Sequence, residues 1–312
     1  RFGVMQRAGF RVARSRSATD NRGRRRVPHH LVMTATPIPR TLSLTVFGDL
    51  DASTIRGLPP GRTPVTNRVV GPDKADEVYR YLRTRIERGE QAYVVVPVID
   101  QQGNETARQL KSVREHVKLL EDKFLQGFRV AAVHGQLKRD TRETIMDRFR
   151  RGVIHVLVAT TVIEVGVDVP NATVMIIEHA ERFGLAQLHQ LRGRVGRGAQ
   201  GVRSLCVFVA SPTTEDAAKR MEAIARTNDG FKIAEMDLEI RGMGDFFGTR
   251  QHGLPPLRVA QIPEDMDLLL LARRDAGTLI DADPELTRPE HAALRKVLLR
   301  EYGEALGLID IG

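Results

Sequence analysis

Short apolar runs alternate with helical repeats through the middle of the chain. Apolar residues recur at helical spacing from Ala75 to Ile86, at Ala75, Val78, Tyr79, Leu82 and Ile86, and again within Lys138–Arg151. Five runs are typical of buried strands: Gln91–Ile99, Phe128–His134, Val153–Ala159, Thr173–Ile177 and Ser204–Val209. This alternation predicts an α/β fold, with a parallel sheet covered by helices on both faces.

Ligands of such sheets bind beyond the carboxyl ends of the strands. The loops expected to carry function are therefore His134–Gly135, Thr160–Asp168 and Glu178–Gly184. Outside the alternating region, Leu31–Met33 predicts a short strand, and the prolines and glycine of Leu58–Pro64 interrupt regular structure. After Ala210 the pattern becomes helical around a glycine-rich insert. We predict four parts: residues 1–57, a linker at 58–72, the α/β domain at 73–211 and a mainly helical region at 212–312.

The composition changes this picture little. Hydrophobic residues make up 41% and charged residues 28% of the 312 residues, which is ordinary for a soluble protein. Cys206, the single cysteine, lies in an apolar run and is expected to be a core residue rather than a reactive thiol, in a reducing cytoplasm. The first residues include neither an initiator Met nor an apolar signal, which predicts a fragment or a start within a gene.

The formal net charge of +9 favours a polyanionic partner such as nucleic acid, although charge alone is weak evidence. Seven arginines are concentrated between Arg11 and Arg26, among Ser, Thr, Asn and Gly. This segment is either a solvated loop or a DNA contact, and the sequence leaves both interpretations open.

The segment Gln187–Gly198 carries the strongest chemical signal. If it is helical, Gln190, Arg194 and Arg197 share one face. Two glycines within it each cost about 1 kcal/mol relative to alanine inside a helix, which indicates that a ligand or another backbone approaches closely. Guanidinium groups three residues apart can bind a triphosphate and neutralise charge on the transferred phosphoryl group. A solvated basic helix is the less favoured alternative.

Gln190–Arg197 resembles motif VI of the superfamily 2 helicases. The resemblance implies that Arg194 and Arg197 are an arginine-finger pair, which faces ATP across a cleft between two motor lobes, and that Gln190 assists them. It further implies that the complete motor uses ATP with Mg²⁺.

Two upstream segments resemble further motifs of that superfamily. Val158–Pro170 resembles motif V, which implies phosphate-backbone contacts from Thr160 and Thr161. The same motif implies a turn at Gly166, followed by Asp168, which would accept a hydrogen bond from a ribose hydroxyl or hold an arginine finger.

Thr34–Pro37, with Thr34 and Thr36, resembles motif III, which links the ATP state to lobe movement. Val133–Gly135 resembles motif IVa, a turn that binds the DNA backbone through His134 and Gly135. His134 could equally be a strand-end histidine without a DNA contact.

Three longer matches narrow the family: Met33–Leu42, Ala180–Gly198 and Asp237–Gly253. All are similar to the RecG family of branch-migration helicases, and much of this similarity is shared with transcription-repair coupling factors. The third match resembles the TRG translocation element, in which Arg241 and Gln251 would couple a loop to a helical hairpin. Three segments favour RecG: Leu58–Arg62, Asn171–Glu178 and Asn228–Glu235.

This resemblance implies a RecA-like second helicase lobe, followed by a mainly helical TRG region. It also implies branched and double-stranded DNA as partners, a monomeric motor, no membrane, and a place in the cytoplasm at the nucleoid. Phosphate-gripping features of a first lobe are missing from the sequence. It contains no Gly-Lys dipeptide and hence no P-loop, and Asp76–Glu77 lies in a helical repeat rather than after a strand.

In RecG proteins an Asp-Glu box directly precedes the run with which this chain begins, Arg1–Val4. We therefore expect the chain alone to lack ATPase activity. Two alternatives stay open, namely the motor of a transcription-repair coupling factor and a truncated, non-catalytic DNA-binding module.

Overall fold

The computed structural model describes residues 63–97, 113–160, 168–198, 203–241 and 265–309, together with single residues at 31, 33, 53, 55 and 57. Contacts divide the chain into two compact units. One contains Ile55–Arg241 with Ala35–Pro37, and the other contains Gly242–Gly312 with most of the N-terminal residues. Five candidate site residues lie outside the described residues: Thr34, Thr36, Thr161, Gly166 and Gln251. The predicted strand at Leu31–Met33 is wrong at its two described positions, because Leu31 and Met33 are exposed and in no strand.

A six-stranded, fully parallel sheet forms the core of the first unit, in the order β1-β6-β5-β2-β4-β3. The prediction of a parallel α/β sheet is confirmed. Runs of mainly β-branched and apolar residues form the four inner strands, β2, β4, β5 and β6, because both of their faces are buried. The strands are β1 (Thr66–Val70), β2 (Gln91–Val95), β3 (Val130–Val133), β4 (Val156–Ala159), β5 (Ala172–Ile177) and β6 (Leu205–Val209).

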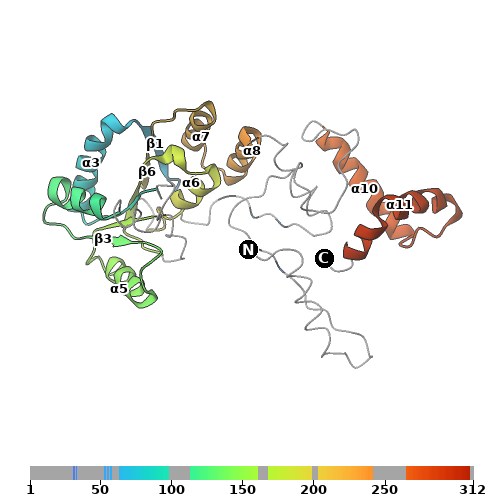
Figure 1. Ribbon diagram of the computed structural model, residues 1–312, viewed down its shortest axis with the longest axis horizontal. Coiled ribbons are helices and arrows are strands. Elements are labelled where there is room, and N and C mark those ends of the chain that lie inside the picture. Colours follow the sequence, from blue (N-terminus) through green and yellow to red (C-terminus); the bar gives the residue numbers. More distant parts are fainter. Residues whose placement is uncertain are drawn as a thin grey trace, which may run out of the picture. The chain divides into compact units, whose positions relative to one another are not determined.

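Successive side chains of β2 to β6 enter two separate cores, one on each face of the sheet. Along β2, Tyr93 and Val95 belong to one core, while Ala92 and Val94 belong to the other. Helix α3 (Ala75–Glu87) and residues 113–124, which end in the π-helical turn η2 (Leu120–Phe124), cover the second core. The first core lies under α5 (Arg139–Arg150), α6 (Leu185–Arg192), α7 (Glu215–Arg226) and α8 (Gly230–Arg241) (Figure 1).

The edge strand β1 was not predicted from the sequence, which assigned residues 58–72 to a linker. Its residues Thr66, Asn67 and Arg68 are polar, and all five residues of the strand are at least partly exposed, so the apolar pattern of a buried strand is missing. Backbone pairing with β6 defines it instead. The predicted domain boundary at residue 211 also falls inside the first unit, because α7 and α8 pack on α6.

The described part of the second unit is helical, as predicted. It contains α10 (Met266–Ala282), the 3₁₀ turn η4 (Pro289–His291) and α11 (Ala292–Ile309). Asp283 organises the turn between them by accepting hydrogen bonds from the backbone N–H groups of Thr287 and Arg288, each at 3.0 Å. Its hydrogen bond with His291 holds the pKa of the Asp283 carboxyl well below its usual range. No helix among the described residues is long and apolar enough to cross a membrane.

Candidate functional site

The carboxyl edge of the sheet brings together the described residues predicted to contact DNA. β3 and β4 are neighbours and end at Val133 and Ala159, so His134, Gly135 and Thr160 follow side by side. The backbone N–H of Thr160 donates to the carbonyl of Val133 at 3.4 Å. Thr160 is buried, whereas Gly135 is exposed and His134 half-buried. The turn after β3 is therefore the accessible part of this group.

Arg142, on α5, holds that turn in shape. Its Nη2 donates to the carbonyl oxygens of Gly135 at 3.3 Å and Leu137 at 3.4 Å. Burial lowers the pKa of His134, and the nearby charges of Arg114 and Arg142 lower it further. The turn is thus flanked by two permanent cations, which suits an anionic ligand. Sequence reasoning missed Arg142 and Arg114, because a helical arginine that binds a turn looks the same in sequence as a solvated one.

A buried polar network lies at the same edge, directly after β5. The Tyr79 hydroxyl donates to Glu178 Oε1, and His116 Nε2 lies 2.8 Å from the Tyr79 oxygen. Since the single hydroxyl proton is given to Glu178, His116 Nε2 must be the donor to Tyr79. Burial raises the pKa of Glu178 and, together with the charge of His179, lowers the pKa of His116 to about 4. The sequence singled out the loop that begins at Glu178 but not these partners.

We expect His116 to make the first unit sensitive to acid. Its pKa in the folded state, about 4, is lower than the roughly 6.5 of an unfolded chain. The folded state therefore binds fewer protons, and the stability that His116 contributes is complete above pH 6.5 and lost as pH falls through 4. Full protonation would cost about 3 kcal/mol of the free energy of unfolding. Denaturant titrations between pH 7.5 and 4 should show a shallower acid loss in His116→Gln than in the wild type.

Lys118→Gln, an exposed change beside it in the same helical stretch, serves as the control and should follow the wild type. The raised pKa of Glu178 acts in the opposite direction, so variant and wild type are compared at each pH. Parallel curves for His116→Gln and the wild type would contradict the prediction.

The arginine-rich motif is not one continuous helix. Helix α6 ends at Arg192 and is capped by Gly193, so Gln190 lies on the helix, whereas Arg194 and Arg197 lie in the turn that follows. Gly196 has φ of +76°, a left-handed conformation that glycine adopts without strain and that ends any helical path. The expected sharing of one helix face by the three residues is therefore wrong. We call residues 193–198 the finger turn.

Arg197 is fixed on the finger turn by two contacts. Its Nε donates to the carbonyl of Gly193 at 3.0 Å, and its Nη1 forms an ion pair with Asp168 Oδ1. Burial raises the pKa of Tyr93 to about 12, while the positive charges of Arg194 and Arg197 act on it in the opposite direction. Both guanidinium groups thus lie near the Tyr93 side chain in the middle of β2. The structure brings together Arg194, Arg197 and Asp168.

This cluster lies toward the amino edge of the sheet, opposite the DNA candidates. A methyl group added at Gly196 would lie 3.2 Å from Val65 Cγ2, and one at Gly198 would lie 2.4 Å from the carbonyl oxygen of Pro170. Val65 and Pro170 come just before β1 and β5. The expectation that all functional loops meet at the carboxyl edge is therefore wrong for Asp168, because the chain has returned to the amino edge before β5 begins.

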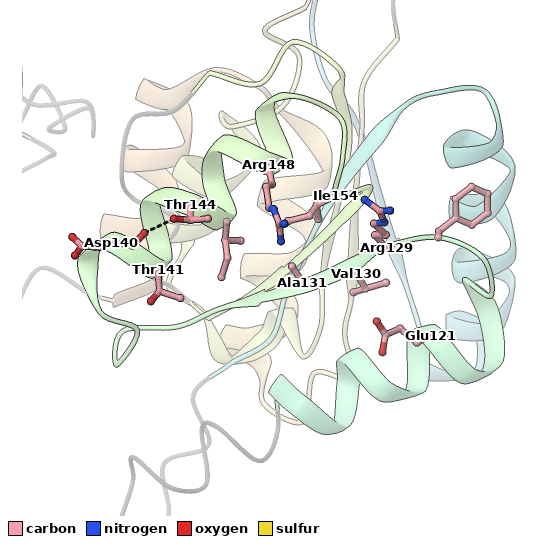
Figure 2. Close-up of a pocket in the computed structure, with 11 residues that line it drawn as sticks. Glu121, Arg129, Val130, Ala131, Asp140, Thr141, Thr144, Arg148 and Ile154 are labelled. Atoms are coloured by element: carbon pink, nitrogen blue, oxygen red, sulfur yellow. Dashed lines mark hydrogen bonds between the residues drawn. The ribbon is translucent and has the colours of Figure 1, made fainter.

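The pocket beside β3 and α5 is separate from both groups. Figure 2 shows the residues that line it: Ala131 on β3 with Thr144 and Arg148 on α5, and Val130 on β3 with Glu121 on the helical segment before β3. Ala131 packs with the core on the α5 side of the sheet, and Val130 packs with the core on the other side. None of the predicted site residues lines it.

The finger turn suits a nucleotide. Two guanidinium groups on one short turn match the oxygens of a polyphosphate, and a neighbouring carboxylate can hold one of them until the phosphates arrive. Among the described residues, no cluster of three His, Cys, Asp or Glu side chains is placed to hold a metal ion, so we assign no magnesium ligand to them.

Two family models match the chain. Residues 73–199 match the helicase conserved C-terminal domain, and residues 227–303 match domain 3, C-terminal, of the ATP-dependent DNA helicase RecG. Among curated relatives, the RecG helicase of Synechocystis sp. is 45% identical over 98% of this chain and 35% of its own length. The RecG helicase of Bacillus subtilis is 42% identical over 96% of this chain and 42% of its own length.

A solved structure of RecG bound to a three-way DNA junction is 43% identical over 81% of this chain and 32% of that chain, with a TM-score of 0.61. The parallel sheet and the family match over residues 73–199 identify this part of the chain as the C-terminal lobe of a helicase motor. The chain belongs to the RecG family of ATP-dependent DNA helicases and is homologous to their C-terminal portion. It spans about a third to two-fifths of the length of these relatives.

Proposed function

We propose that this chain is the second motor lobe and DNA-coupling region of an ATP-dependent helicase that remodels branched DNA. The observation that carries the proposal is the finger turn, where Arg197 rests on Asp168 beside Arg194. Similarity to RecG relatives supports the choice of branched DNA, and one of these proteins was solved on a three-way junction. ATP, bound with Mg²⁺ at the junction with a first lobe, would supply the free energy for movement.

Within this proposal, the residues of the chain divide the work between the two edges of the sheet. Arg194 and Arg197 neutralise the negative charge of the nucleotide phosphates, and Asp168 keeps Arg197 oriented while no phosphate is bound. At the opposite edge, the turn His134–Leu137, shaped by Arg142, binds the phosphate backbone without reading bases. The roles of Gln190, Thr160 and Arg241, the last residue of α8, stay predictions, as do those of Thr34, Thr36, Thr161, Gly166 and Gln251.

We expect the chain alone to bind DNA and to hydrolyse no ATP above background. Two to four phosphate contacts would make the affinity for a three-way junction fall roughly 10- to 100-fold between 50 and 200 mM salt. Fluorescence anisotropy with a labelled junction measures the binding, and phosphate release measures hydrolysis. DNA-stimulated hydrolysis by the pure chain that disappears in Arg197→Ala would overturn the expectation for the chain alone.

A matched pair of variants on α5 tests the DNA-binding edge. Arg142→Ala removes the guanidinium that holds the turn, whereas Arg139→Ala removes an exposed guanidinium paired with Glu143 on the same helix. We expect weaker junction binding in the first variant and wild-type binding in the second. Equal binding by both variants would remove the turn from the proposal.

A further inference from the structure

Arg192, the last residue of α6, is a buried arginine whose partners are not carboxylates. It is 3% exposed, and burial lowers its pKa to about 10. Its Nη1 donates to the carbonyl of Thr227 at 2.7 Å and to that of Ile224 at 3.5 Å. Its Nη2 lies 2.6 Å from His189 Nδ1, which must accept because arginine only donates. Leaving a buried guanidinium without hydrogen-bond acceptors is costly. The Arg192 guanidinium therefore holds its three acceptors in place.

The two carbonyls that Arg192 binds belong to the end of α7 and its junction with α8. Residues 227–229 connect α7 to α8, and the backbone N–H of Phe231, in the first turn of α8, donates to Asp229 Oδ1 at 2.8 Å. Carbonyls at a helix C-terminus lack intrahelical donors and carry partial negative charge. The guanidinium therefore satisfies the end of α7 and connects it directly to the helix that carries the finger turn.

Two asparagines tie the same junction to the start of β1. Asn67 Nδ2 donates to the Ile224 carbonyl at 3.0 Å and to Asn228 Oδ1 at 3.1 Å. Asn228 Nδ2 donates in turn to the carbonyl of Val65 at 3.0 Å. Val65 also lies against Gly196 of the finger turn. The finger turn, the first residues of β1 and the α7–α8 junction thus meet at one place.

We propose that Asn67, Arg192 and Asn228 form a joint through which a displacement of the finger turn moves α8. The proposal rests on the proposed function, because α8 ends at Arg241, where the glycine-rich segment predicted to engage DNA begins. Arg192 is a positioning residue in this scheme. The neighbouring arginines of the finger turn bind the nucleotide. When they move, the hydrogen bonds of Arg192 to the α7–α8 junction displace α8, including its far end.

Hydrogen exchange in the 312-residue chain tests the joint without any nucleotide. Arg192→Met removes the donors but keeps an unbranched apolar side chain. Hydrogen bonds from a charged group stabilise the contact between α6 and the α7–α8 junction. Their loss should therefore speed amide exchange in α8 about tenfold or more, while exchange in the central strands stays unchanged. Arg192→Lys, which retains a donor, should restore part of the protection. Arg226→Met, on α7, removes an exposed guanidinium paired with Glu222 and should leave α8 unchanged.

Unchanged exchange in α8 would overturn the joint, and so would faster exchange spread evenly over α8 and the central strands, because Arg192 would then be a general stabilising residue. A second measurement reports how tightly ATP hydrolysis is coupled to junction unwinding. With a first motor lobe joined to the chain, Arg192→Met should hydrolyse ATP within about twofold of wild type, yet unwind about tenfold less junction per ATP, and Arg192→Lys should recover part of this yield.

A parallel fall in hydrolysis and unwinding, or an unchanged yield per ATP, would contradict the joint. If the wild-type two-lobed protein itself neither hydrolyses ATP nor unwinds DNA, the proposed function fails. The exchange measurement then still decides whether the joint exists.

Discussion

Replacing Arg197 with alanine is expected to lower DNA-stimulated ATP hydrolysis about 10³-fold in the chain joined to a first motor lobe, because the arginine finger that we propose at this position contributes at least that much to phosphoryl transfer. The loss is expected in kcat more than in KM, since the guanidinium acts on charge that develops in the transition state. Steady-state phosphate release over a range of ATP concentrations measures both constants. The substitution also removes the ion pair with Asp168, an exposed contact that adds little to stability.

The control for this variant is Arg139→Ala, which removes an exposed arginine from the same lobe. It should hydrolyse ATP at the wild-type rate. A loss in Arg197→Ala smaller than tenfold, with the fold intact by circular dichroism, would mean that Arg197 does not reach the nucleotide. A rise in KM with unchanged kcat would instead assign it to ground-state binding.

The strands that are buried on both faces were predictable, because such strands must be apolar along their whole length. Val156–Ala159 and Ala172–Ile177 are of this kind: the first lies within a predicted run, and the second begins one residue before its predicted run. Strand β1 was not predictable in this way, since its polar residues belong to an edge strand whose position depends on pairing with β6. A run of apolar residues identifies a strand because the strand is buried. Strand β1 lies at the edge of the sheet and is only partly buried, so it lacks such a run.

The residue types of the candidate site were predictable, but their grouping was not. Spacing alone suggested that Gln190 and Arg197 share a helix face, whereas Gly193 ends the helix between them. Asp168 was recognised as a possible holder of an arginine finger, and the structure shows it paired with Arg197. Arg192 lies in the same motif, yet its sequence neighbours do not show that it is buried, because its partners Ile224 and Thr227 are more than thirty residues away.

Gly198→Ala should lower hydrolysis by the two-lobed protein about 100-fold while leaving the lobe folded. A methyl group at this position would lie 2.4 Å from the Pro170 carbonyl oxygen, a contact that neither backbone relieves without moving. Pro170 follows Asp168 by two residues, and Gly198 follows Arg197 directly. The substitution therefore pushes apart the two segments that form the Asp168–Arg197 pair, and a misplacement of about 1 Å at a catalytic group costs roughly 10²-fold.

Gly277→Ala is the matched control, because an added methyl group there meets no atom within 4 Å and the position lies inside helix α10. It should retain full activity and gain slightly in helix stability, by about 1 kcal/mol or less. Full activity in Gly198→Ala would show that the finger turn tolerates displacement, and the tight packing of Gly198 on Pro170 would then have no part in placing Arg197. Low activity accompanied by a lost thermal transition would instead assign the glycine to the stability of the lobe.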